Sequence, residues 1–81
     1  MREIIKALNL LTGEFVDIYT DHKLFGKQHI QMQFEPETEL GSGFRCKGQR
    51  IYIDHDDVTG YTITNEKIVV YSKLMRITII K

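Results

Sequence analysis

The sequence contains no tryptophan, one proline and one cysteine, and it has no excess of either charge. Eleven Lys and Arg residues balance eleven Asp and Glu residues in a chain of 81 residues. Proteins dedicated to nucleic acids usually carry a basic excess, so this balance argues against that class. The single cysteine, Cys46, cannot form an internal disulfide, which fits a reducing compartment and a cytoplasmic location.

Long apolar runs and catalytic motifs are also missing. No apolar run approaches the roughly 18 residues that a membrane-spanning helix needs, and the N-terminal MREIIKALNLL lacks the cleavage pattern of a signal peptide. The sequence has no Gly-x-Ser-x-Gly, no phosphate-binding glycine loop and no His-Glu-x-x-His. So short a chain also has little material for a substrate cleft. We therefore expect a non-enzymatic protein that uses no cofactor and contacts no membrane.

The apolar residues that are present predict one folded domain over residues 1–81. Hydrophobic residues make up 42% of the chain, and they alternate mostly with a period of two, most clearly in HIQMQFE at residues 29–35. Turn signals such as TNEK at residues 64–67 separate the apolar runs at short intervals. The sequence predicts a mainly β fold, a small antiparallel barrel or sandwich of about six or seven short strands.

The N-terminal residues 2–11 fit two predictions. Ile4, Leu8 and Leu11 recur at helical spacing, and Gly13 would then end the helix. This pattern predicts an α+β fold with an N-terminal helix packed on the sheet. A β-hairpin that turns at TGE fits the same residues, and the plainly β pattern after the turn favours this hairpin.

The C-terminal segment KIVVYSKLMRITIIK is apolar on both faces of its predicted strands. Ile79 and Ile80 are neighbours in one strand, so their side chains point to opposite faces. A domain of this size has little material to cover a second apolar face, and an uncovered strand of this kind aggregates. Either the N-terminal segment or a second copy of the chain is expected to cover it.

The stretch YIDHDDVTGY places Asp54, Asp56 and Asp57 around His55. Neighbouring residues of a strand diverge, whereas the ligands of a metal must converge. Asp56 or Asp57, followed by VTG, is instead typical of a turn or a short helical cap, in which a carboxylate accepts backbone N–H bonds. The alternative is a small metal- or ligand-binding protein centred on His55.

The stretch GFRCKGQRIY gathers basic and aromatic residues on one predicted hairpin, in which Cys46 is expected to be a buried small hydrophobic residue. Surfaces of this composition bind single strands, because aromatic rings stack on bases while cations contact phosphates. A nucleic-acid-binding small β-barrel using residues 44–52 is therefore an alternative function. The predicted binding surface consists of Phe44, Arg45, Lys47, Arg50, Tyr52, Asp54 and Asp56.

The function that the sequence favours is a protein–protein interaction module of the adaptor or inhibitor type, which associates with itself. Small proteins without catalytic motifs commonly have such roles in bacteria and their phages. Tyr and Arg are frequent anchors of interfaces, because they combine a large contact area with directed hydrogen bonds. Acidic and basic groups alternate along the chain and could steer an identical partner. The sequence does not identify a partner.

Overall fold

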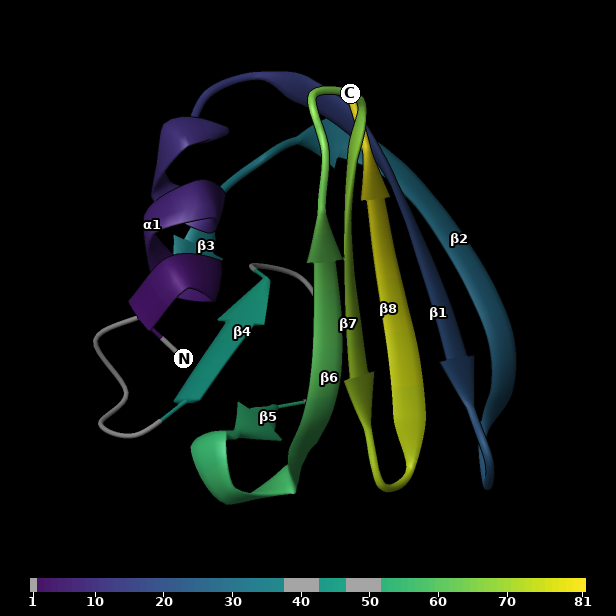
Figure 1. The fold of residues 1–81 in the computed structure, drawn as a ribbon. Helices are drawn as coiled ribbons and strands as arrows, with labels where there is room; N and C mark the ends of the chain where they lie inside the picture. Colours follow the sequence, from purple (N-terminus) through teal and green to yellow (C-terminus); the bar gives the residue numbers. More distant parts are fainter. Residues whose placement is uncertain (1, 38–42, 47–51) are drawn as a thin grey trace.

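The computed structural model describes residues 2–37, 43–46 and 52–81, and their fold is mainly β (Figure 1). A five-stranded antiparallel sheet has the strand order β2-β1-β8-β7-β6, and a small sheet has the order β3-β4-β5. The large sheet consists of β1 (Phe15–His22), β2 (Gly26–Gln33), β6 (Val58–Ile63), β7 (Lys67–Ser72) and β8 (Met75–Ile80). The other elements are α1 (Arg2–Leu10), β3 (Pro36–Glu37), β4 (Gly43–Cys46), β5 (Ile53–Asp54) and the 3-10 helix η1 (His55–Asp57).

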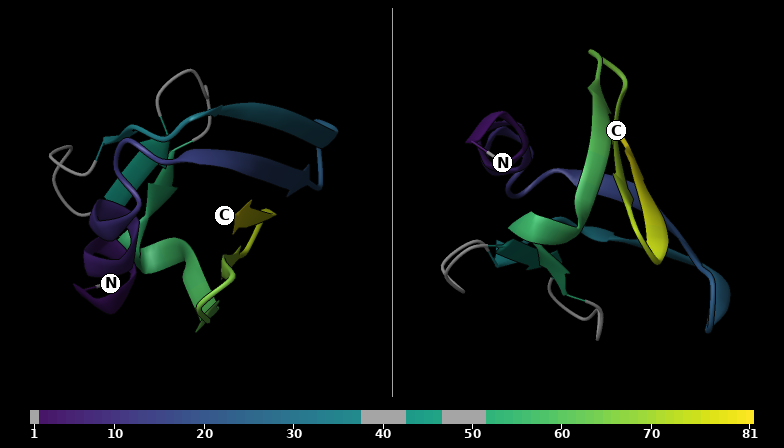
Figure 2. Two further views of the ribbon diagram at one scale, coloured as in Figure 1. Left: turned by 90° about the horizontal axis from the view of Figure 1, so that it is seen from above. Right: turned by 60° about the horizontal axis from the view of Figure 1, so that its bottom comes forward.

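The five-stranded sheet is strongly bent, and α1 and the small sheet close its concave side (Figure 2). We call this side the inner face and the opposite side the outer face. Side chains alternate between the two faces along each strand, as the period of two predicts. The core lies on the inner face, where it includes Ile4 and Leu8 from α1, Ile18, Val70, Ile77 and Ile79 from the large sheet, and Phe34, Phe44 and Ile53.

The N-terminal segment is a helix, so the β-hairpin favoured for residues 2–11 is wrong. Ile4, Leu8 and Leu11 lie on one side of the helical segment and are almost fully buried, whereas Leu10 is exposed. A helix of nine residues is marginal alone, and burial of this apolar side stabilises it. Gly13 has a φ of +87° and lets the chain turn into β1, as the helical prediction required.

The C-terminal apolar strands are covered by the chain's own N-terminal segment. Ile77 and Ile79 of β8 point to the inner face, where they belong to the same core as the residues of α1. Ile80 points to the outer face, as the alternation predicts, and it is half-buried there. The inner face therefore needs no second copy of the chain to cover it.

Side chains that bond to the backbone fix the hairpins of the large sheet. In the predicted turn at residues 64–67, Thr64 Oγ1 accepts the backbone N–H groups of Glu66 at 3.2 Å and Lys67 at 3.1 Å. Between β1 and β2, His22 Nδ1 accepts the N–H groups of Leu24 at 3.0 Å and Phe25 at 3.2 Å. These bonds set the register of β6 and β2, which are the two outermost strands of the sheet.

Candidate binding surfaces

The aromatic residue that opens the predicted binding surface is part of the core. Phe44 has a relative exposure of 1%, because it belongs to the same core as Leu8 of α1 and Val70 of β7. Its ring cannot stack on a base at the surface, so the prediction of an exposed Phe44 is wrong. The period of two could have shown this, because Phe44 lies two residues before Cys46 and therefore shares the face of the strand on which Cys46 was expected to be buried.

The cation beside Phe44 is paired within the small sheet. β3 and β4 place Glu37 opposite Arg45, and Arg45 Nε donates a hydrogen bond to Glu37 Oε2 at 2.9 Å. Both side chains are about one-third exposed, and a pair of this kind contributes about 0–1 kcal/mol. Arg45 therefore neutralises an acidic neighbour of its own chain, and it is a weaker phosphate-binding candidate than the sequence indicates.

The remaining residues of the predicted surface do not form one described site. Lys47 and Arg50 lie outside the described residues. Tyr52 is partly exposed and lies over Gly43, where an added Cβ would collide with the Tyr52 ring and with the backbone carbonyl of Ile53. Glycine at this position thus permits the close approach of β4 and residues 52–53.

The acidic residues around His55 form a helical cap, as the sequence predicts. Asp54 is the N-cap of η1, and its Oδ1 accepts the backbone N–H of Asp56 at 3.0 Å. The prediction placed the cap at Asp56 or Asp57, but it is two or three residues earlier, because the strand ends at Asp54. Among the described residues, no group of three His, Cys, Asp or Glu side chains converges as metal ligands would.

Cys46 is a buried member of the core, as predicted. Its relative exposure is 1%, and burial raises the pKa of its thiol from 9.0 to about 12. The neutral thiol therefore persists throughout the physiological range. Since the thiolate is the nucleophile in cysteine chemistry, this environment is that of a packing residue.

The outermost strand β6 carries no charged residue along VTGYTI. It pairs with β7 on one side, and no other described strand pairs with it on its second side. Tyr61 and Ile63, which point to the inner side at this margin, keep exposures of 45% and 40%. A strand of Val, Thr, Tyr and Ile without charge has the composition that pairs readily with another strand.

The opposite outermost strand, β2, differs from β6 in composition. Lys27 lies near its start and is exposed, and the ring of His29 contacts Asp17 of β1 through Nε2 and Oδ1 at 2.9 Å. Glutamines occupy much of the rest of the strand. A lysine on an outermost strand opposes pairing with further chains, so β6, which has no charge, is the more favourable strand for the addition of another strand.

The comparisons with known proteins found no relative from which a function could be transferred. No family model matches the chain, and neither a search of curated proteins nor one of solved structures returned a match. No helix in the described part of the chain is long and apolar enough to cross a membrane. The fold is that of a small mainly β domain.

Proposed function

We propose that this protein is a non-enzymatic, cytoplasmic protein-binding module that associates with itself by pairing β6 with β6 of a second copy. The single observation that carries the proposal is the uncharged outermost strand with two half-exposed large side chains, Tyr61 and Ile63. Strand addition gains affinity from main-chain hydrogen bonds and specificity from the alternate side chains.

A second copy suits this strand because a twofold antiparallel pair brings the same surface together from both sides. A charge near the twofold axis would then face the same charge of the second copy, and β6 carries no charge at any position. Tyr61 and Ile63 of both copies would lose exposed apolar area, which stabilises the dimer by about 25 cal/mol per Å². The contact is confined to one strand, so a weak and reversible dimer is expected.

The proposal is tested by measuring the solution mass of the protein over a range of micromolar concentrations with analytical ultracentrifugation. The wild-type chain should pass from monomer to dimer as its concentration rises. Thr62→Lys places a cation in the middle of β6 on the outer face, and it should keep the chain monomeric at every concentration.

Leu24→Lys is the matched control. Leu24 lies in the turn between β1 and β2 and is 75% exposed, so this variant introduces the same cation at a surface position outside β6. It should dimerise like the wild type. A wild type that stays monomeric at high micromolar concentration contradicts the proposal, and so does a dimer that Leu24→Lys abolishes and Thr62→Lys leaves intact.

A further inference from the structure

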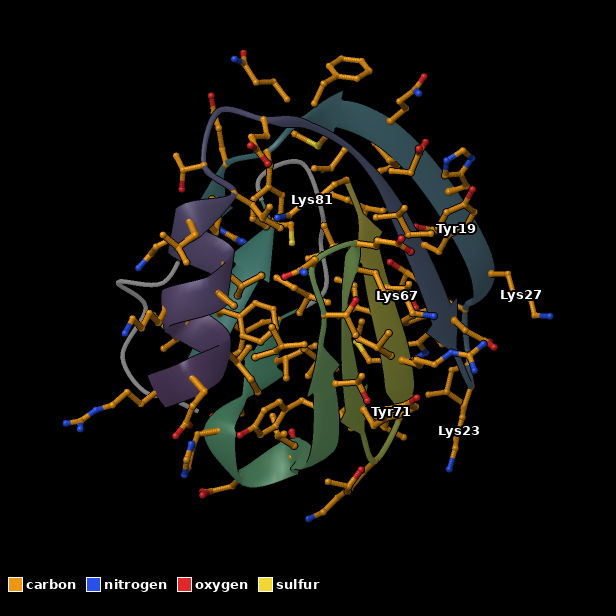
Figure 3. The ribbon with its side chains drawn as sticks, turned by 45° about the horizontal axis from the view of Figure 1, so that its top comes forward. Tyr19, Lys23, Lys27, Lys67, Tyr71 and Lys81 are labelled. Carbon is orange, nitrogen blue, oxygen red and sulfur yellow. The ribbon has the colours of Figure 1, made fainter. Side chains whose placement is uncertain are left out.

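The outer face of the five-stranded sheet carries a row of charged and aromatic residues that strand pairing at β6 does not use. Cross-strand register places Lys27, Asp21, Arg76 and Tyr71 next to one another on β2, β1, β8 and β7. Figure 3 shows Lys27 and Tyr71 on the side of the sheet turned away from α1. Four strands from both ends of the chain thus supply one continuous polar row.

A second row of side chains lies on the same face, two residues away from the first row on each strand. Tyr19 lies opposite His29 on one side and Thr78 on the other. The rings of Tyr19 and His29 stack in parallel, with centroids 4.3 Å apart and an interplanar angle of 4°. This contact holds the Tyr19 ring in place, and the residue remains 43% exposed.

Each tyrosine lines a shallow open pocket, and the two pockets share Arg76 and Asp21. The pocket beside Tyr19 has a volume of about 130 Å³ and also includes Lys27. The pocket beside Tyr71 has a volume of about 240 Å³ and also includes Lys23. Both are smaller than the roughly 300–1,000 Å³ of pockets that enclose whole small-molecule ligands. They suit flat groups that lie on an open surface.

The cations of this face exceed its carboxylates. Lys23, Lys27 and Lys67 form no ion pair with any described carboxylate. Arg76 contacts Asp21 at 3.5 Å, and both side chains are about half exposed. So exposed a pair is worth about 0–1 kcal/mol, and a phosphate could therefore replace the carboxylate at Arg76.

We propose that the outer face binds single-stranded nucleic acid, with bases stacked on Tyr19 and Tyr71 and phosphates held by Arg76 and the lysines. Binders of single strands combine aromatic platforms with a cationic track along the backbone. Lysine is depleted in the core of protein–protein interfaces, whereas Lys27 and Lys23 line the pockets beside the two tyrosines here. The neutral total charge is compatible with this site, because acidic residues such as Asp54, Asp56 and Asp57 lie elsewhere.

The test is the fluorescence anisotropy of a labelled oligothymidylate titrated with the full chain. Binding should weaken steeply between about 50 and 200 mM salt, because bound phosphates release counterions. Tyr71→Leu removes the stacking surface and should weaken binding by at least about fivefold. Tyr71→Phe keeps the ring and should bind like the wild type, which separates stacking from any structural effect.

Two charge variants test the cationic track. Lys27→Ala should weaken binding and lower the salt slope by about 0.7, the value for one lost phosphate contact on a single strand. Asp21→Asn removes the carboxylate that competes for Arg76 and should strengthen binding. Arg45→Ala on the small sheet is the control and should leave affinity unchanged.

Several outcomes would overturn the proposal. These are no binding at about 50 mM salt, equal affinity for Tyr71→Leu and Tyr71→Phe, or a loss with Arg45→Ala equal to that with Lys27→Ala. Binding to vesicles of anionic lipid without binding to the oligonucleotide would assign the face to a membrane surface instead. Circular dichroism of each variant verifies that a loss of affinity is not a loss of fold. The solution mass of the protein does not enter these outcomes, so this proposal and the proposed dimer fail separately.

Discussion

The small sheet and the five-stranded sheet both combine aromatic and cationic residues, but they use them differently. On β4, Phe44 enters the core and Arg45 is paired with Glu37. On the large sheet, Tyr19 and Tyr71 keep more than two-fifths of their surface exposed. In the small sheet, residues adjacent in sequence separate into the core and an internal ion pair. In the large sheet, residues distant in sequence meet on one open face.

Truncating one ring in each region should produce the largest contrast. Phe44→Ala removes a fully buried ring and should lower the free energy of unfolding by about 3–5 kcal/mol. Tyr71→Ala should lower it by less than about 1 kcal/mol, because Tyr71 is 41% exposed. Denaturant unfolding followed by circular dichroism measures both. Similar losses for the two variants would contradict the division between a structural and an exposed region.

Two glycines, one in each sheet, test the same difference in packing with the addition of a single methyl group. Gly43→Ala forces a Cβ into the Tyr52 ring and the Ile53 carbonyl, and it should cost about 1–3 kcal/mol of stability. Gly60 of β6 has its nearest heavy atom, Tyr71 Cδ2, at 4.0 Å from an added Cβ. Gly60→Ala should therefore change stability by less than about 0.5 kcal/mol. Equal midpoints for both variants in urea would show that β4 and residues 52–53 are not closely packed.

The acidic turn beside the small sheet should give the smallest effect. Asp54→Ala removes the side-chain acceptor for the Asp56 N–H and should cost about 1 kcal/mol. Asp56→Ala leaves that bond intact and should be nearly neutral. Thermal unfolding distinguishes the two variants. A larger loss with Asp56→Ala would assign the turn a role other than capping.

Local patterns in the sequence predicted much of the fold. The period of two gave the strands, and the turn at residues 64–67 and the cap beside His55 followed from their polar residues. Residues 2–11 were mispredicted because a short amphipathic run fits both a helix and a hairpin. Burial against the concave sheet decides between them, since Ile4, Leu8 and Leu11 reach one core only as a helix.

The candidate surfaces were harder to predict, because they depend on which distant strands pair in the sheet. The outer face requires Tyr19 to lie opposite Thr78, a pairing between the two ends of the chain that no local pattern specifies. The outermost position of β6 likewise follows from the order of strands in the sheet. The only local feature that points to this position is the uncharged run VTGYTI. Charged residues precede and follow this run in the sequence, so the run does not stand out.

Amide hydrogen exchange of β6 as a function of protein concentration is the most direct test of the proposed pairing between β6 strands of two copies. In an unpaired outermost strand, alternate N–H groups face water and exchange rapidly. The account predicts that these amides of β6 become protected as the concentration rises and remain unprotected in Thr62→Lys, while those of β2 do not change in either chain. Exchange in β6 that is independent of concentration, or protection that appears in β2 instead, would contradict it.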